Sequence, residues 1–253
     1  MQHLIQLAFG AFGTLLFVAL AHRKIGNYPK ALLKSKNSRL ELLEVFIIWG
    51  LMFASVTYLV LASYLFKIFY PFVEIGGFWF SMHFFLMLIV PFSIEVLIHH
   101  RSMSELGFSL PINWLPASAL IAFGFFFGFF AFLFERPNPA SPRYLLMGLL
   151  TPAFTEEWVY RSVIQTKLER VLDQNGAWLL AGLLFGLIHV PTNFFGPLWV
   201  ASGGEIIAAL VRLFGQCTFG WLWGILFMKC RSLFPTVIAH YLSDFLPGIL
   251  AHV

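Results

Sequence analysis

Apolar runs long enough to cross a lipid bilayer recur along almost the whole chain. A helical span needs about 20 consecutive apolar residues. Such runs occur at residues 4–22, 45–66, 78–98, 115–134, 144–166, 177–197, 205–228 and 233–250. They are continuously apolar, whereas the strands of a membrane barrel alternate polar and apolar side chains over about 10 residues. We therefore predict an all-α polytopic membrane protein with about eight transmembrane helices in one bundle.

The composition supports a membrane protein of one domain. The chain is 59% hydrophobic and 11% charged, and a soluble domain carries roughly 25% charged residues. No hydrophilic stretch is long enough to fold separately, so residues 1–253 are expected to form a single integral membrane domain. The largest polar segment, 23–44, ends in the run "NSRLELLEVF", which predicts an amphipathic helix on the membrane surface.

Basic residues are distributed unequally between the two sides of the predicted bundle. Eleven Lys and Arg fall in connections on one side and three on the other, which predicts that the richer side is cytoplasmic and that both termini are not. This bias accounts for most of the net charge of +4, so no nucleic-acid partner is expected. The lipid bilayer is the expected partner. The first span lacks the basic region and cleavage site of a signal peptide, so we expect it to be the first anchor of a multi-pass protein. The lack of an evident targeting signal favours a prokaryotic plasma membrane, and an endoplasmic reticulum protein would look similar.

The stretch "TPAFTEEWVYR", residues 151–161, places three ionisable groups inside an apolar run. Each such group costs ~2.5–3.5 kcal/mol at the centre of a membrane. Glu157 and Arg161 are four residues apart and can form an ion pair on one helix face, which leaves Glu156, about 100° away around the helix, without a local partner. Pro152 predicts a kink beside the glutamates. The alternative is that the three charges only cap the end of a span.

Two further segments carry histidine at a comparable depth. In "FGLIHVP", His189 lies about a dozen residues into its span, where a single histidine can also be a simple hydrogen-bonding group between helices. In "AHYLSDF", His240 and Asp244 are four residues apart on one helix face. The carboxylate can orient the imidazole, or both groups can bind the same ligand.

These residues lie on three predicted helices and can converge on one water molecule. A carboxylate and an imidazole together make a general base, and an imidazole on another helix can stabilise the oxyanion of a tetrahedral intermediate. A divalent metal such as Zn, held by Glu156, His189, His240 and Asp244, would serve equally well, so the cofactor is either such a metal or none. In both cases the chemistry predicted is hydrolysis by an activated water.

The order and spacing of these residues resemble the CPBP family of intramembrane endopeptidases, the CAAX-protease and bacteriocin-processing family. Its three motifs are EExxxR, FxxxH and HxxxN/D. They stand here as Glu156-Glu157-x-x-x-Arg161, Phe185-x-x-x-His189 and His240-x-x-x-Asp244. The resemblance covers about residues 100–250, which would form the catalytic core.

The resemblance implies an endopeptidase that cuts near the C-terminus of a membrane-associated protein or peptide. Glu156 would be the general base, His189 would bind and activate the water, and His240 with Asp244 would form the oxyanion site or complete a metal site. The residues that would support this arrangement are Glu157, Arg161 and Phe185. Members that trim prenylated CAAX ends have Asn at the last position. Because ionised Asp244 only accepts hydrogen bonds, it would orient His240, stay protonated or bind metal, and the substrate could be prenylated or carry a sorting tag.

Two other functions remain open at this point. Acidic and histidine residues in spans also build the proton relays of transporters and proton-coupled channels. A member of the family could also act by binding alone, as an immunity or scaffolding protein. Three further polar residues inside apolar spans, Glu95, His83 and Arg212, could line a substrate cavity or pair with each other.

Overall fold

Helices make up nearly all of the computed structural model, which describes residues 2–68, 71–135 and 137–252. The helices of the first half are α1 (Gln2–Arg23), α2 (Ser38–Val60), α3 (Met82–Phe92) and α4 (Trp114–Glu135). Those of the second half are α5 (Pro142–Gly148), α6 (Thr155–Glu157), α7 (Thr166–Val171), α8 (Gln174–Leu187), α9 (Val190–Phe195), α10 (Pro197–Ala201), α11 (Ile206–Cys230) and α12 (Leu233–Leu250). Wider π-helical turns extend or join several of them at Leu61–Phe66, Ser93–Ile98, Leu149–Phe154 and Trp158–Gln165.

The predicted all-α membrane fold is confirmed, and the number of spans is not. Within the described residues, five helices are long and apolar enough to cross a membrane. They are Ser38–Phe66, Trp114–Phe134, Gln174–Phe195, Ile206–Cys230 and Leu233–Leu250. Two shorter apolar helices cover Leu7–Arg23 and Met82–Ile98. The fifth predicted span, 144–166, is a broken helix with buried charges, so the count of eight stays a prediction.

A short β-hairpin precedes α3, where the sequence predicted the start of a span. Strands β1 (Phe72–Ile75) and β2 (Phe78–Ser81) pair antiparallel, and Gly76 and Gly77 have φ values of 58° and 81°. Two successive residues with positive φ favour glycine and match the tight turn of a two-residue hairpin. The predicted span 78–98 is therefore wrong at its start, because its first four residues complete this hairpin.

The start of α2 turns its acidic side chains into the protein, although Ser38, Arg39 and Leu40 are exposed. Asn37 caps the helix by accepting a hydrogen bond from Leu40 N, and α2 continues directly into the second predicted span. Glu41 is 4% exposed. The predicted surface helix "NSRLELLEVF" is wrong because its acidic side chains turn inward to meet cations from other helices.

We call the group of charges that they meet the ionic network: Glu41, Glu44, Glu95, Arg101 and Lys167. Lys167 Nζ lies 2.9 Å from Glu41, 2.5 Å from Glu44 and 2.6 Å from Glu95. Arg101 binds Glu41 at 2.7 Å and Glu95 at 3.0 Å. Lys167 and Glu95 are fully buried. The network therefore joins α2, the turn after α3 and α7 at one end of the bundle.

Glycines allow the helices that carry the second half of the fold to approach closely. On α4, Gly124 and Gly128 face α12, and a methyl group at either position would overlap the α12 backbone. Gly182 of α8 and Gly220 of α11 make a similar contact. Small residues at such crossings are typical of helix packing in membranes. These contacts fix the positions of α8, α11 and α12 relative to their neighbours.

Lys229, near the end of α11, caps the C-terminal end of α1. Its ammonium group donates to the carbonyl oxygens of Ala21, His22, Ile25 and Gly26, at 2.6, 3.0, 3.1 and 2.8 Å. The last carbonyls of a helix have no partner within the helix, and here a buried cation from another helix supplies one. We call this contact the Lys229 clamp.

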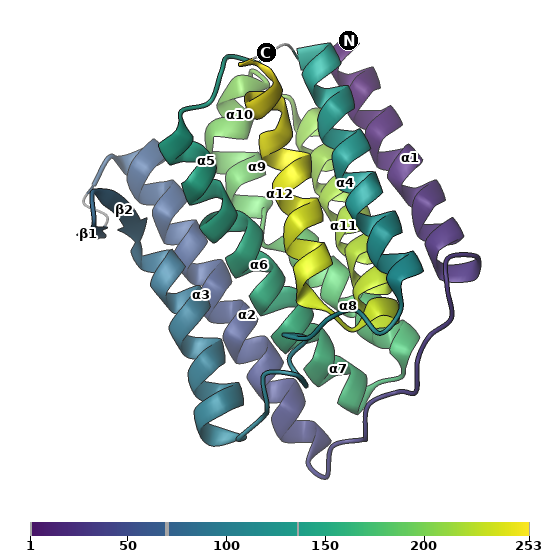
Figure 1. Ribbon diagram of the computed structural model, residues 1–253. Helices are drawn as coiled ribbons and strands as arrows, with labels where there is room; N and C mark the ends of the chain where they lie inside the picture. The colour runs from purple at the N-terminus through teal and green to yellow at the C-terminus, as the bar shows by residue number, and fades with distance from the viewer. Residues whose placement is uncertain (1, 69–70, 136, 253) are drawn as a thin grey trace.

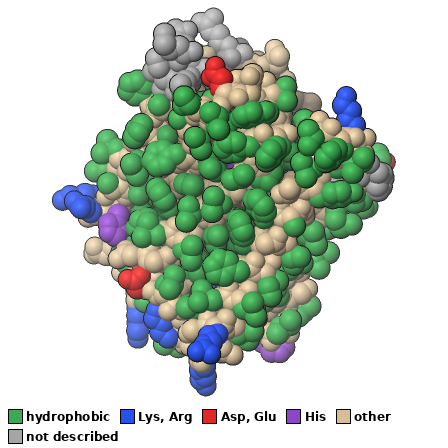
Figure 2. Space-filling model, turned by 180° about the vertical axis from the view of Figure 1, so that it is seen from behind, with side chains coloured by type: hydrophobic (Ala, Val, Ile, Leu, Met, Phe, Trp, Pro, Cys, Tyr) green, Lys and Arg blue, Asp and Glu red, His purple; other side chains and the backbone are tan. Residues whose placement is uncertain are grey.

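The arrangement in space fits a protein embedded in lipid. The helices run roughly side by side, and the two ends of the chain lie at the same end of the bundle, as the charge count predicts (Figure 1). In Figure 2, hydrophobic side chains cover the middle of the face shown, and charged side chains lie near its edges. Which end faces the cytoplasm stays a prediction.

Candidate active site

A break in the helix after α5 positions the two glutamates. Thr151 has non-helical backbone angles, φ −145° and ψ 117°, immediately before Pro152. This confirms the kink that Pro152 predicts, since proline cannot donate a backbone hydrogen bond to the preceding turn. The helix restarts beyond it, and α6 carries Glu156 and Glu157 on different faces.

Glu157 is fully buried and both of its oxygens accept hydrogen bonds. Arg161 Nε donates to Oε2 at 3.0 Å, as the four-residue spacing predicts. His240 Nδ1 donates to Oε1 at 2.9 Å, which ties α6 to α12. These two bonds, one from its own helix and one from α12, hold the Glu157 side chain in one position. Removing one partner of such a buried charged pair is strongly destabilising.

Glu156 turns to the other side of α6 and is more accessible. Its side chain is 20% exposed, and Oε2 lies 4.0 Å from His240 Nε2. Within the described parts of the chain its carboxylate accepts no hydrogen bond at normal length. Of the adjacent glutamates, Glu156 is thus the one whose oxygens remain available.

The imidazole of His240 lies between carboxylates from two helices. Nδ1 faces Glu157, while Nε2 is 3.4 Å from Asp244 Oδ2 on the same helix face. The doubly protonated ring is the form that donates from both nitrogens. Asp244 is 46% exposed and accepts a hydrogen bond from Ser243 Oγ at 2.8 Å.

His189 lies where α8 ends and α9 begins, and its ring orientation is set by its own helix. Nδ1 donates to the backbone oxygen of Phe185 at 2.8 Å, because a carbonyl can only accept. In the neutral ring this leaves Nε2 as an acceptor. His189 can therefore accept a proton, or a hydrogen bond from water, at Nε2.

Phe185 packs against the charged groups that support the site. Its ring lies under the Arg161 guanidinium, 4.9 Å from Cζ, and its centroid is 5.1 Å from that of His189 and 6.4 Å from that of His240. Arg161 Nη1 and Nη2 are buried without hydrogen-bond partners among the described residues. The aromatic face therefore provides the favourable contact for the rest of the guanidinium.

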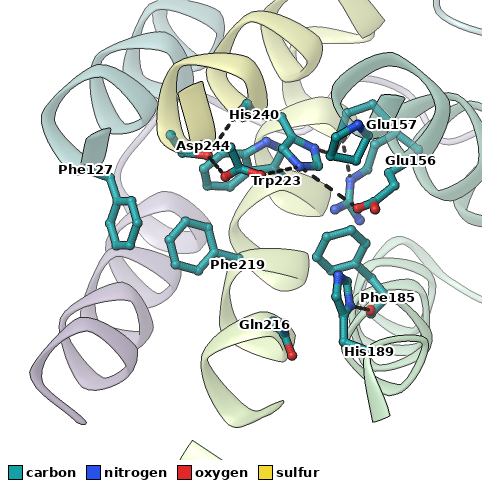
Figure 3. Close-up of a pocket in the computed structure, with 13 residues that line it drawn as sticks. Phe127, Glu156, Glu157, Phe185, His189, Gln216, Phe219, Trp223, His240 and Asp244 are labelled. Atoms are coloured by element: carbon teal, nitrogen blue, oxygen red, sulfur yellow. Dashed lines mark hydrogen bonds and ion pairs between the residues drawn. The ribbon is translucent and has the colours of Figure 1, made fainter. Parts of the chain in front are cut away.

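The seven residues of the three sequence motifs all line one cavity of about 330 Å³. Glu156, His240 and Asp244 lie along one side of it and His189 on another (Figure 3). The other residues that line it are Phe127, Pro152, Gln216, Phe219, Trp223 and Ser243. Gln216 was not predicted as a cavity residue, although an amide within the apolar run 205–228 is a signal that could have identified it.

The other polar residues considered from the sequence lie outside this cavity. Glu95 belongs to the ionic network. His83 Nδ1 is 2.5 Å from Ser55 Oγ, and Arg212 donates to the backbone oxygen of Leu198 at 2.9 Å. None of the three pairs with another of the set in the contacts of the described residues. Their role in this structure is to join neighbouring segments.

The four residues that could hold a metal do not form a compact set of ligands. Among the described residues, three ligand atoms within 4.8 Å of one another occur at Glu44, Glu95 and His99. There the ammonium of Lys167 already provides the positive charge. In the cavity, Glu156, His240 and Asp244 instead meet as an imidazole between carboxylates. Metal dependence stays a prediction.

The comparisons with known proteins place this cavity in a family. Residues 137–246 match the family model described as Type II CAAX prenyl endopeptidase Rce1-like. This segment contains all three motifs and every residue of the cavity except Phe127. No curated protein and no solved structure matches the chain. The protein is an integral membrane protein, and its segment 137–246 is similar to the Rce1-like type II CAAX prenyl endopeptidase family, in agreement with the resemblance that its motifs predicted.

Proposed function

We propose that the protein is an intramembrane endopeptidase that hydrolyses a peptide bond near the C-terminus of a membrane-associated protein or peptide. One observation carries this proposal. Glu156 faces the cavity with its oxygens available, while the adjacent Glu157 is fully used in holding Arg161 and His240. An available carboxylate beside imidazoles is the arrangement that activates water.

In the proposed reaction, Glu156 removes a proton from a water molecule in the cavity. His189 Nε2, oriented by the bond from Nδ1 to Phe185 O, accepts a hydrogen bond from the same water. The water oxygen then attacks the carbonyl carbon of the substrate, and the electrons of the C=O bond move to its oxygen. A general base of this kind contributes about 10²–10⁴-fold to the rate.

His240 stabilises the negative oxygen that forms. Its Nδ1 is bound to Glu157 and its Nε2 points towards Glu156 and Asp244, at the edge of the cavity. As an imidazolium it donates a hydrogen bond to the oxyanion. When the oxyanion collapses, the C–N bond breaks, and the proton held by Glu156 passes to the leaving nitrogen.

The supporting residues keep His240 and Glu156 in place. Glu157 and Arg161 form a buried pair within one helix, and Phe185 packs on both Arg161 and His240. Asp244 fixes the other side of the His240 ring. We assign these four residues positioning roles.

The proposal is tested with purified protein in liposomes and two internally quenched peptides. One ends in a farnesylated CAAX sequence, the kind of substrate that the family is named for, and the other carries an unmodified C-terminal tag behind an apolar anchor. Wild type is compared with Glu156→Gln, which keeps the shape of the side chain, and with Glu74→Gln in the exposed hairpin as a matched control.

Cleavage of at least one peptide by wild type and Glu74→Gln, and its loss in Glu156→Gln, is the expected result. The peptide that is cut identifies the substrate class. Cleavage by Glu156→Gln at the wild-type rate would refute Glu156 as the general base. Loss of activity with a chelator, restored by Zn²⁺, would replace the proposed metal-free mechanism with metal-assisted hydrolysis. Solute uptake without cleavage of either peptide would support the transporter.

A further inference from the structure

We propose that Gln216 is an additional catalytic residue, whose side-chain amide donates a hydrogen bond to the oxyanion, and that Asn193 positions it. This inference rests on the proposed function and adds to it a group outside the three motifs. Gln216 comes from α11, the helix that crosses the bundle between α8 and α4. It lines the same cavity as His189 and His240.

A buried contact sets the orientation of the Gln216 amide. Asn193, on α9, is fully buried. Its Nδ2 donates to Gln216 Oε1 at 2.6 Å. With its oxygen engaged in this way, the amide presents its NH₂ group as the free end. Among the described residues, Nε2 of Gln216 makes no hydrogen bond of its own.

A second observation concerns Asn193, the buried partner of Gln216. The other amide atom of Asn193, Oδ1, is buried without a partner among the described residues. Burying a polar group without a hydrogen bond costs free energy, and the Asn193 side chain, with one hydrogen bond among the described residues, carries that cost. Its one hydrogen bond aligns Gln216, which lies in Figure 3 beside His189 and below Phe219.

The chemistry of the cavity needs this donor. Ionised Glu156 and Asp244 can only accept hydrogen bonds, and His189 offers an acceptor at Nε2. Of these four motif residues, His240 is thus left as the donor, and the guanidinium of Arg161 lies against the Phe185 ring. Oxyanion sites usually aim more than one donor at the developing charge. The NH₂ group of Gln216 supplies the second one.

Trp223 is another N–H group of the cavity wall, and its position does not suit the role. Its side chain is 3% exposed and Nε1 is buried without a partner among the described residues. The ring packs between Phe123 and Phe219, with centroid distances of 5.6 and 5.2 Å. The indole N–H is therefore enclosed in an aromatic cluster, whereas Gln216 lines the cavity with its amide oriented by Asn193.

The experiment measures kcat and KM separately on whichever peptide wild type cleaves. Gln216→Met keeps the length of the side chain and removes the donor, so kcat should fall by about 10²–10³-fold and KM should change by less than about threefold. In Asn193→Asp the carboxylate cannot donate to Gln216 Oε1, so the amide turns its NH₂ group away from the cavity. This variant should lose kcat to a similar extent with Gln216 still present.

Two comparisons separate catalysis from folding. The double variant Asn193→Asp with Gln216→Met should lose no more kcat than Gln216→Met alone, because both changes remove one interaction. Gln165→Met is the matched control. Gln165 is buried outside the cavity and donates to the backbone oxygen of Gly224 on α11, the helix that also carries Gln216, at 2.7 Å. It should lower the melting temperature in detergent and leave kcat unchanged.

The inference can fail while the proposed function stands. If Glu156→Gln is inactive and Gln216→Met keeps the wild-type kcat, Gln216 has no catalytic role. A rise in KM at constant kcat would make it a substrate-binding residue and overturn the oxyanion role. If kcat falls equally in Gln165→Met, the loss reflects folding and the inference is wrong. If Glu156→Gln remains active, the proposed mechanism itself is wrong, and the inference about Gln216 falls with it.

Discussion

Two clusters of carboxylates meet the same broken helix, one at Lys167 and the other at Glu156 and Glu157, and they are neutralised to different extents. In the ionic network, three glutamates meet Lys167 and Arg101, and Arg170 lies 3.8 Å from Glu95. In the cavity, three carboxylates meet one permanent cation, Arg161, together with imidazoles. Lys167 is fully buried, whereas Asp244 is 46% exposed.

The difference distinguishes charges that hold the fold from charges that remain available for chemistry. A buried charge is tolerated when a partner neutralises it, and the ionic network meets this requirement with its own lysine and arginines. The cavity has more acids than permanent cations and an opening to one side. Groups with unbalanced charge in a cavity are candidates for proton transfer, which is the chemistry proposed for Glu156.

The largest expected effect on activity comes from removing the available carboxylate. Glu156→Gln should reduce kcat by about 10²–10⁴-fold, the contribution of a general base. Its melting temperature should stay close to that of wild type, because the side chain is partly exposed and makes no structural hydrogen bond at normal length within the described residues. Peptide cleavage and thermal unfolding, measured on one preparation, check both parts. A large fall in the melting temperature of Glu156→Gln would show that Glu156 stabilises the fold.

The opposite pattern is expected for the ionic network. Lys167→Met leaves three carboxylates with too few cations and should destabilise the fold by ~3–5 kcal/mol. The kcat of the protein that remains folded should be unchanged, because Lys167 does not line the cavity. Unfolding in denaturant, with activity normalised to the folded fraction, provides the measurement. A specific loss of kcat would show that the two clusters are coupled.

Arg161→Lys keeps the positive charge of the cavity and changes its geometry. A lysine cannot reproduce both the bond to Glu157 and the flat contact with Phe185. We expect a loss of stability of about 1–2 kcal/mol, within the range of cation–π and charged hydrogen-bond contributions, together with a lower kcat as His240 loses its fixed partner. Arg101→Lys serves as the control. An unchanged kcat would limit the role of Arg161 to neutralising charge.

The smallest effect is expected at Asp244, the most exposed of the three carboxylates in the cavity. Asp244→Asn can still accept from Ser243 Oγ, so stability should change by less than about 0.5 kcal/mol, as for most surface substitutions. The new amide can donate to an oxyanion. In a Gln216→Met background it should therefore recover part of the lost kcat. No recovery would argue that Asp244 acts only through His240.

Residues related by helical spacing were the part of the site that could be predicted from sequence. Glu157 with Arg161, and His240 with Asp244, are each four residues apart, and this spacing places them on one face of a helix. The kink before Glu156 followed in the same way from Pro152.

Contacts between helices could not be predicted from local spacing. Glu41 resembles a surface residue in its own segment and becomes buried because Lys167, 126 positions away, reaches it. Gln216 becomes part of the cavity only through the crossing of α11 with α8 and its bond to Asn193. The role of Glu157 as a bridge also required His240 to approach from another helix.

The Lys229 clamp bears on how this protein can be shortened. The segment that matches the family, 137–246, contains Lys229 but none of the four carbonyl groups that it binds. A truncated chain without α1 would leave that ammonium without these carbonyl partners, and one without α4 would expose the face of α12 at Ala239, Leu242 and Leu246. We therefore expect segment 137–246 to need the helices that carry no motif in order to fold.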